Sequence, residues 1–132
     1  MDTILGGRVE RSRRTLLLAA GDAAMIAAFV ALGELRHAGT LAAGLETFAQ
    51  FGLGWLLAGT LAGVYAPGAV DSARRAVVQG VAAWVLAALV GQLVRVLMRP
   101  GTFVLPSFVL VSVGAGGLLI GLWRFVAARQ LE

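Results

Sequence analysis

The sequence predicts an all-α integral membrane protein, built as a four-helix up-down bundle. The chain is strongly apolar, with a mean hydropathy of +0.87 and 59% hydrophobic residues, whereas a soluble domain of this size needs far more polar surface. Only 14% of its residues are charged, and they leave four nearly uncharged stretches, each long enough to cross a hydrocarbon core of about 30 Å. The connections between these stretches are short, so consecutive helices are expected to be antiparallel neighbours.

The first half of the chain holds a leader and two spans. Residues 1–14 are polar and rich in arginine, and we expect them to form a basic cytoplasmic leader. The first span covers about residues 15–35 and ends at the connection RHAGT. The second span covers about residues 41–65, and Pro67 and Gly68 after it break the helix.

The second half holds the other two spans. The third covers about residues 73–98 and is closed by RPGT. The fourth covers about residues 103–128, with Pro106 in its first turn, where a missing N–H costs little. We therefore predict one transmembrane domain over residues 15–128. The final residues 131–132, Leu131 and Glu132, resemble a cloning remnant, so no function is assigned to them.

Arginine supplies all 11 basic residues, and its distribution predicts the orientation of the bundle. Positive charge is retained in the cytoplasm, so the end with more arginines should be cytoplasmic. We therefore expect both termini in the cytoplasm of a multi-pass protein of the cell membrane. The end that carries the termini has Arg8, Arg11, Arg13, Arg14, Arg74, Arg75, Arg124 and Arg129, and the other end has Arg36, Arg95 and Arg99.

The same composition argues against several classes of function. Arginines at helix ends serve topology and contact with lipid headgroups, so the sequence pI of 11.4 does not indicate nucleic-acid binding. With no cysteine and a single histidine, His37, the chain has no thiolate site and no histidine cluster for a metal. No nucleophile–base set is recognisable, and the glycine-rich residues 114–117 lie inside an apolar stretch, where a phosphate loop does not occur. We therefore expect no enzyme and no cofactor.

Small residues recur at helical spacing in three of the spans. Lipid tails supply no hydrophobic drive between helices, so close approach through small residues holds membrane bundles together. We expect these residues to pack helices within one chain or across a homo-oligomer, with the lining of a pore as the alternative. They are Gly59 and Gly63 in the second span, Ala83, Ala87 and Gly91 in the third, and Gly117 and Gly121 in the fourth.

Polar residues inside the spans form two predicted layers with an apolar middle between them. A charge in hydrocarbon costs about 3 kcal/mol or more, so such groups normally face the interior and have partners. Near the arginine-rich end, a predicted inner polar cluster comprises Asp22, Gln79 and Arg124. Near the other end, a predicted outer polar cluster comprises Glu46, Gln50, Gln92, Arg95 and Ser107.

Asp22 permits two interpretations. An acid within a span is by default a candidate for a proton- or cation-coupled site. It can equally be a buried clamp that fixes helix register, through a hydrogen bond, an arginine partner or protonation. A single acid without a second one at its depth does not decide between the two.

Four short motifs stand out: GD at 21–22, GW at 54–55, AGVYAPGAVDSARRA at 62–76 and AALVGQLVR at 87–95. They resemble the domain of unknown function 3054 family, a group of small membrane proteins of haloarchaea and some bacteria. The resemblance covers most of residues 15–128. It implies no activity, since none is established for the family, and it marks as positions of interest Asp22, Trp55, Tyr65, Trp84 and Arg95.

Small multidrug resistance transporters offer a second comparison. They also have four helices and an acid in the first helix. Their essential acid is a glutamate, however, and their helices carry aromatic cage residues. Here the first span has Asp22 and only one aromatic residue, Phe29, so we do not adopt this assignment.

Two functional hypotheses follow. In the first, the protein transports or conducts a small ion or solute. Asp22 is then the coupling or binding carboxylate with Gln79 and Arg124 nearby, and the outer gate is formed by Glu46, Gln92 and Arg95. In the second, it is a non-transporting lipid-binding or accessory membrane subunit, in which Asp22 is a structural clamp. Transport predicts a continuous polar cavity that joins the two layers, whereas the second hypothesis predicts a dry, closed bundle with an apolar external groove. Membrane lipids and further copies of the chain are the expected partners.

Overall fold

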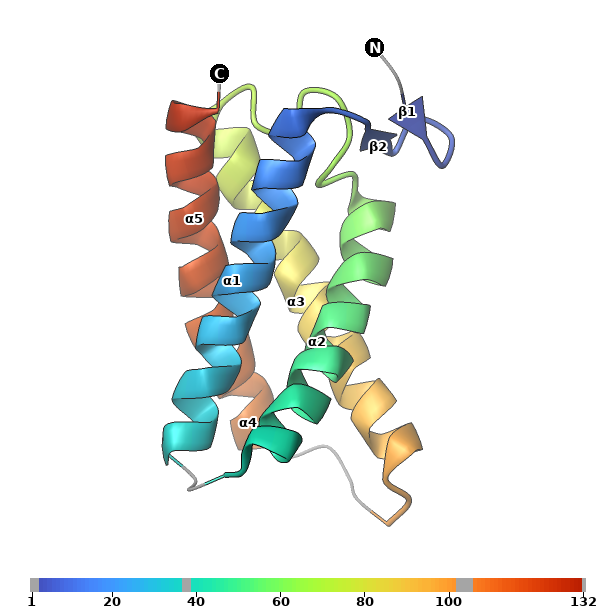
Figure 1. Cartoon of the computed structure of the whole chain (residues 1–132), viewed down its shortest axis with the longest axis vertical. Helices are drawn as coiled ribbons and strands as arrows, with labels where there is room; N and C mark the ends of the chain where they lie inside the picture. The colour runs from blue at the N-terminus through green and yellow to red at the C-terminus, as the bar shows by residue number, and fades with distance from the viewer. Residues whose placement is uncertain (1–2, 37–38, 102–105, 132) are drawn as a thin grey trace.

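The computed structural model describes residues 3–36, 39–101 and 106–131, and these form a bundle of four long helical segments (Figure 1). Each segment is long and apolar enough to cross a membrane, which confirms the predicted four-helix bundle and makes the chain a multi-pass membrane protein. The first three segments are α1 (Arg13–Arg36), α2 (Leu41–Ala62) and α3 (Ala73–Met98). The fourth is built from α4 (Pro106–Val111), the π-helix η1 (Ser112–Gly116) and α5 (Gly117–Gln130).

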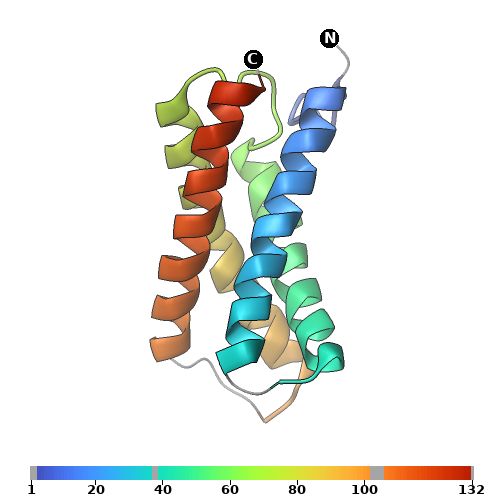
Figure 2. The same ribbon diagram turned by 60° about the vertical axis from the view of Figure 1, so that its left-hand side comes forward.

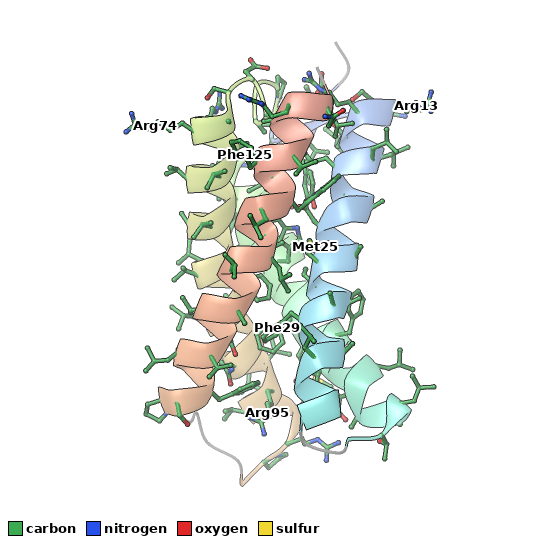
Figure 3. All side chains as sticks on the ribbon, turned by 90° about the vertical axis from the view of Figure 1, so that its left-hand side faces the viewer. Arg13, Met25, Phe29, Arg74, Arg95 and Phe125 are labelled. Atoms are coloured by element: carbon green, nitrogen blue, oxygen red, sulfur yellow. The ribbon has the colours of Figure 1, made fainter. Side chains whose placement is uncertain are left out.

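The helices are arranged as a closed ring of antiparallel neighbours. The helix α2 packs along α3, α3 packs along α5, and α1 contacts both α2 and α5. Both termini lie at the same end of the bundle (Figures 1 and 2). Arg13 and Arg74 lie at that end and Arg95 near the opposite one (Figure 3). The charge asymmetry thus exists in three dimensions, while the cytoplasmic location of the arginine-rich end stays a prediction.

The helix α2 ends earlier than the predicted residue 65. Gly63 adopts a left-handed φ of 79°, and its N–H bonds to the carbonyls of Gly59 and Thr60, as expected for a glycine that caps a helix. Gly63 thus terminates α2, and a Cβ there would lie 3.4 Å from Nε2 of Gln79 on α3, so its role in helix packing stays a prediction. The predicted start of the fourth span, residues 103–105, lies outside the described residues.

The predicted leader contains a small β-hairpin. The strands β1 (Thr3–Ile4) and β2 (Val9–Glu10) pair antiparallel. The backbone N–H of Glu10 also donates to the carbonyl of Tyr65 at 2.7 Å, and Arg8 Nη1 donates to the carbonyl of Leu61 at 2.8 Å. The hairpin therefore attaches to the last turn of α2 and to the segment that follows it, through contacts between residues more than fifty positions apart.

Most of the predicted packing residues do pack helices within this one chain. A Cβ on Gly54 would overlap the carbonyl oxygen of Ala87 and lie 3.1 Å from the N atom of Gly91, so α2 and α3 approach through these three residues. Ala83 and Ala87 are fully buried in the same interface region. Oligomerisation stays a prediction, and it would need a different surface.

The remaining glycines that are predicted to pack helices also contact residues of the same chain. Gly121 faces Val81 and Val77 on α3, so the small residues of α5 serve the contact with α3. Gly59 lies against Val64 and Trp55 of its own segment. The role of the second-span pair of glycines in helix packing stays a prediction. The other packing residue of the fourth span, Gly117, lies near Trp84 and Val81.

Candidate functional site

A buried ion pair joins the first and last helices. Arg124 of α5 donates from Nε to Oδ1 of Asp22 at 3.0 Å and from Nη2 to Oδ2 at 2.6 Å. Asp22 is 0% exposed and Arg124 1%. This two-point geometry matches the planar guanidinium to the planar carboxylate and is the strongest form of such a pair. The two charges therefore neutralise each other inside the bundle.

The rest of the Arg124 guanidinium is also satisfied. Its Nη1 donates to the carbonyl of Val64 at 2.9 Å, and its Cζ lies 5.5 Å from the ring centroid of Trp55 and 5.4 Å from that of Tyr65. Both ring distances fit cation–π contacts. The stem of Arg124 passes over Gly80, where a Cβ would lie 2.9 Å from Cγ. Four segments of the chain thus converge on one cation.

Tyr65 and Trp55 complete the environment of the carboxylate. The Tyr65 hydroxyl donates to Oδ2 of Asp22 at 2.6 Å, and Nε1 of Trp55 donates to the Tyr65 oxygen at 2.8 Å. Burial and the adjacent Asp22 carboxylate raise the pKa of Tyr65 above its ordinary value, so the hydroxyl keeps its proton and remains a donor. We call Asp22, Arg124, Tyr65 and Trp55 the Asp22 site.

The structure brings together two of the three predicted inner residues. Asp22 and Arg124 pair directly, whereas the Gln79 amide donates to the carbonyl of Ala62 at 2.7 Å and its Oε1 is buried without a hydrogen-bond partner among the described residues. The spacing of polar residues does not predict the roles of Tyr65 and Trp55, although the family resemblance marks both positions. Tyr65 lies beyond the end of α2, so helical spacing alone could not align it with Asp22.

The predicted outer cluster is looser. Arg99 Nε donates to Oε1 of Glu46 at 2.8 Å, and the Gln50 amide lies 3.5 Å from the same oxygen. Arg95 takes no part in that pair, and its Cζ lies 5.6 Å from the ring of Phe108. Ser107 is exposed on α4 and, among the described residues, shares no hydrogen bond with the other members.

Gln92 is the unusual member of the outer cluster. Its side chain is only 2% exposed, yet neither Oε1 nor Nε2 has a hydrogen-bond partner within the described part of the chain. A buried amide without partners costs about 1–3 kcal/mol. Such a group marks a place where a polar partner would be stabilising.

Between the two polar layers lies an aromatic column, which we define as Phe29, Phe51, Trp55, Trp84 and Phe108. The rings of Phe51 and Trp84 are stacked with centroids 5.7 Å apart, and Phe29 meets both edge-on at 5.2 and 5.6 Å. Trp55 and Phe108 extend the column at its two ends. Apolar rings therefore fill the bundle from the Asp22 site to the neighbourhood of Arg95.

The π-helix η1 is built around Trp84. A π-turn leaves backbone groups without their ordinary helical partners, and Nε1 of Trp84 donates to the carbonyl of Ser112 at 2.9 Å. The indole sits on Gly116, where any Cβ would overlap the ring. Ser112 Oγ in turn donates to the carbonyl of Phe108 at 2.6 Å. The π-turn thus provides the carbonyl and the glycine that the Trp84 indole contacts, and the indole provides a hydrogen-bond donor to the π-turn.

Metal and small-molecule sites are sparse in the described residues. Within residues 3–36, 39–101 and 106–131, no three His, Cys, Asp or Glu side chains come together as metal ligands would. A cavity of about 10 Å³, enough for one water molecule, lies beside Glu10, Arg14 and Tyr65. A larger open groove runs along the first turns of α3.

Fold and site together define a class of protein: a four-helix multi-pass membrane protein whose first and last helices are joined by a buried, hydrogen-bonded ion pair. The family described as "Protein of unknown function (DUF3054)" matches residues 19–127. The chain belongs to this family, which confirms the resemblance seen in its motifs. No curated protein and no solved structure matches the chain.

Proposed function

We propose that this protein is a non-transporting membrane subunit that acts through its outer surface, as a lipid-binding or accessory component. The observation that carries the proposal is the state of Asp22. Both carboxylate oxygens accept hydrogen bonds from Arg124, Oδ2 accepts a further one from Tyr65, and the side chain is 0% exposed. A carboxylate that exchanges ions must become accessible during its cycle, and this one is enclosed and neutralised.

The aromatic column supports the same proposal. A permeation path needs polar groups or water along its length, yet the rings of Phe29, Phe51 and Trp84 occupy the space between the two polar layers. An arrangement of interlocked rings at contact distance is typical of a packed core. The ion pair then serves as a clamp between α1 and α5.

One observation favours the alternative, permeation of a small ion or solute. Gln92 offers a buried amide with no partner among the described residues. In transport proteins such groups bind polar solutes. In a transporter, a second conformation would separate the rings of the aromatic column and open a route from Gln92 to Asp22.

A flux measurement decides between the two. The purified chain is reconstituted into liposomes that contain a pH-sensitive dye. Proton gradients are imposed alone, and sodium and potassium gradients are imposed with a protonophore present, so that cation movement drives a compensating proton movement that the dye reports. We expect the wild-type protein and Asp22→Asn to give the same dye response as empty liposomes. An ionophore added at the end of each run shows that the vesicles were sealed and the dye responsive.

A transport function makes the opposite prediction. Flux above that of empty liposomes, lost in Asp22→Asn and in Gln92→Leu while both variants keep their helical circular dichroism, would refute the proposal. In that case Asp22 would be a transport carboxylate and Gln92 part of the path.

A further inference from the structure

An open groove of about 380 Å³ lies on the outer side of α3, at the arginine-rich end of the bundle. The groove follows one face of the helix over its first three turns. Its lining residues are Ser72, Arg74, Arg75, Val78, Gln79 and Ala82, and we call it the α3 groove.

The mouth of the α3 groove carries two unpaired positive charges. Arg74 and Arg75 are both exposed, and neither forms a side-chain hydrogen bond or ion pair within the described part of the chain. The acid Asp71 forms no ion pair among the described residues, but its Oδ2 and Nη1 of Arg75 both lie beside Gly68, 3.1 and 2.9 Å from the position of a Cβ there. Asp71 therefore offsets part of the Arg75 charge. The mouth keeps a net positive charge, to which Arg74 contributes fully, and is complementary to an anion.

The polarity of the groove changes along its length. Val78 and Ala82 are exposed and apolar, and Ala82 lies seven residues beyond Arg75, which is about 10 Å along the helix axis. The α3 span begins at Ala73, so the arginines stand at headgroup level and the apolar residues stand within the acyl region. Charge at the surface and apolar surface below it is the profile of a phospholipid.

Two of the lining residues are held by hydrogen bonds. Gln79 is held by the hydrogen bond from its Nε2 to the carbonyl of Ala62 on α2. Ser72 Oγ accepts a hydrogen bond from the backbone N–H of Arg75, which sets the start of α3. The side chains of Arg74 and Arg75 are not held in this way by any described residue, so they lose side-chain entropy when an anion binds.

We propose that the α3 groove binds the headgroup of an anionic glycerophospholipid, with the phosphate between Arg74 and Arg75 and one acyl chain along Val78 and Ala82. This inference deepens the proposed function. It rests on the proposed function for one claim, that the protein acts through its outer surface. It names the site and the chemical class of its ligand.

Native mass spectrometry of the delipidated protein in neutral detergent tests the inference. Phosphatidylglycerol and phosphatidylcholine with the same acyl chains are titrated separately, and the bound fractions are compared. We expect phosphatidylglycerol to bind more tightly. In the double variant Arg74→Gln, Arg75→Gln its affinity should fall about 30-fold, since each arginine near a headgroup contributes about fivefold.

The matched control is Arg11→Gln, Arg13→Gln. It removes the same charge from exposed arginines at the same end of the bundle, and Figure 3 shows Arg13 on the opposite side of that end from Arg74. We expect this control to retain phosphatidylglycerol. If both double variants lost the same affinity for phosphatidylglycerol, the lipid would be held by diffuse electrostatic attraction, and the proposed site would be overturned. Equal binding of phosphatidylglycerol and phosphatidylcholine by the wild-type chain would also overturn it.

Two further arms separate a lipid from free phosphate. Ala82→Phe fills the apolar part of the groove without changing charge, and it should weaken phosphatidylglycerol binding. Inorganic phosphate, added at the same concentration as phosphatidylglycerol, should not displace the bound lipid. If it did displace the lipid, the lipid assignment would be overturned. The flux measurement is independent of these results, because a conducting bundle would refute the proposed function even if the α3 groove bound lipid as expected.

Discussion

Arg124 lies with its guanidinium edge against both carboxylate oxygens of Asp22, at 3.0 Å from Oδ1 and 2.6 Å from Oδ2, although 102 residues separate the two positions. Arg124 also donates to the carbonyl of Val64, directly after the Gly63 cap of α2. One side chain thereby connects α1, α5 and the α2–α3 connection. Its neutralisation within the core explains how two charges can reside in an apolar bundle.

The first prediction concerns this pair. Asp22→Asn leaves the Arg124 charge buried without its counter-ion, so the free energy of unfolding should fall by about 3–5 kcal/mol. Adding Arg124→Met removes the stranded charge, and the double variant should be more stable than Asp22→Asn alone. Unfolding by denaturing detergent, followed by circular dichroism, measures all the variants. If the two substitutions were simply additive, the pair would not be coupled.

The second prediction uses the single tyrosine of the chain. Burial and the Asp22 carboxylate raise the pKa of Tyr65, so the folded state favours the protonated hydroxyl. The resulting stability is fully present below the unfolded pKa of about 10 and is lost as the pH rises above it. The ultraviolet absorbance of tyrosinate should therefore stay low above pH 10 while the protein is folded. Titration near pH 10 without unfolding would contradict the buried hydroxyl.

The third prediction tests the contact between the Trp84 indole and Gly116 of η1. Gly116→Ala places a methyl group in the Trp84 ring, so it should destabilise the protein by about 1–3 kcal/mol through overpacking. Gly114→Ala is the matched control, because a Cβ there would meet no atom within 4 Å among the described residues. Thermal unfolding in detergent compares the two variants with the wild type. Equal melting temperatures for both variants would show that the indole does not occupy this position.

The fourth prediction separates the two interpretations of Gln92. If the amide has only a structural position, Gln92→Leu removes an unpaired polar group and should raise stability by about 1 kcal/mol or leave it unchanged. Gln50→Leu serves as the comparison, since the Gln50 amide lies near Glu46. Thermal unfolding is the measurement. A loss of stability in Gln92→Leu would show that the amide has a partner, such as a bound polar solute.

The fold could be predicted closely because its causes are local in the sequence. Apolar runs as long as a bilayer is thick must form helices, since each backbone polar group needs an internal partner in lipid. The span at residues 73–98 therefore coincides with α3 (Ala73–Met98). The predicted end of α2 is too late, because Gly63 continues the apolar pattern while its left-handed backbone ends the helix.

The sequence by itself determined the four spans, the antiparallel order, the arginine-rich end and the depth at which Asp22 and Arg124 could meet. Only the tertiary structure decided which groups surround them. Tyr65 reaches Asp22 because the segment after Gly63 folds back over the bundle, and Gln79 turns to Ala62 instead. Depth follows from counting residues along a helix, whereas the direction of a side chain depends on how neighbouring helices are rotated and packed.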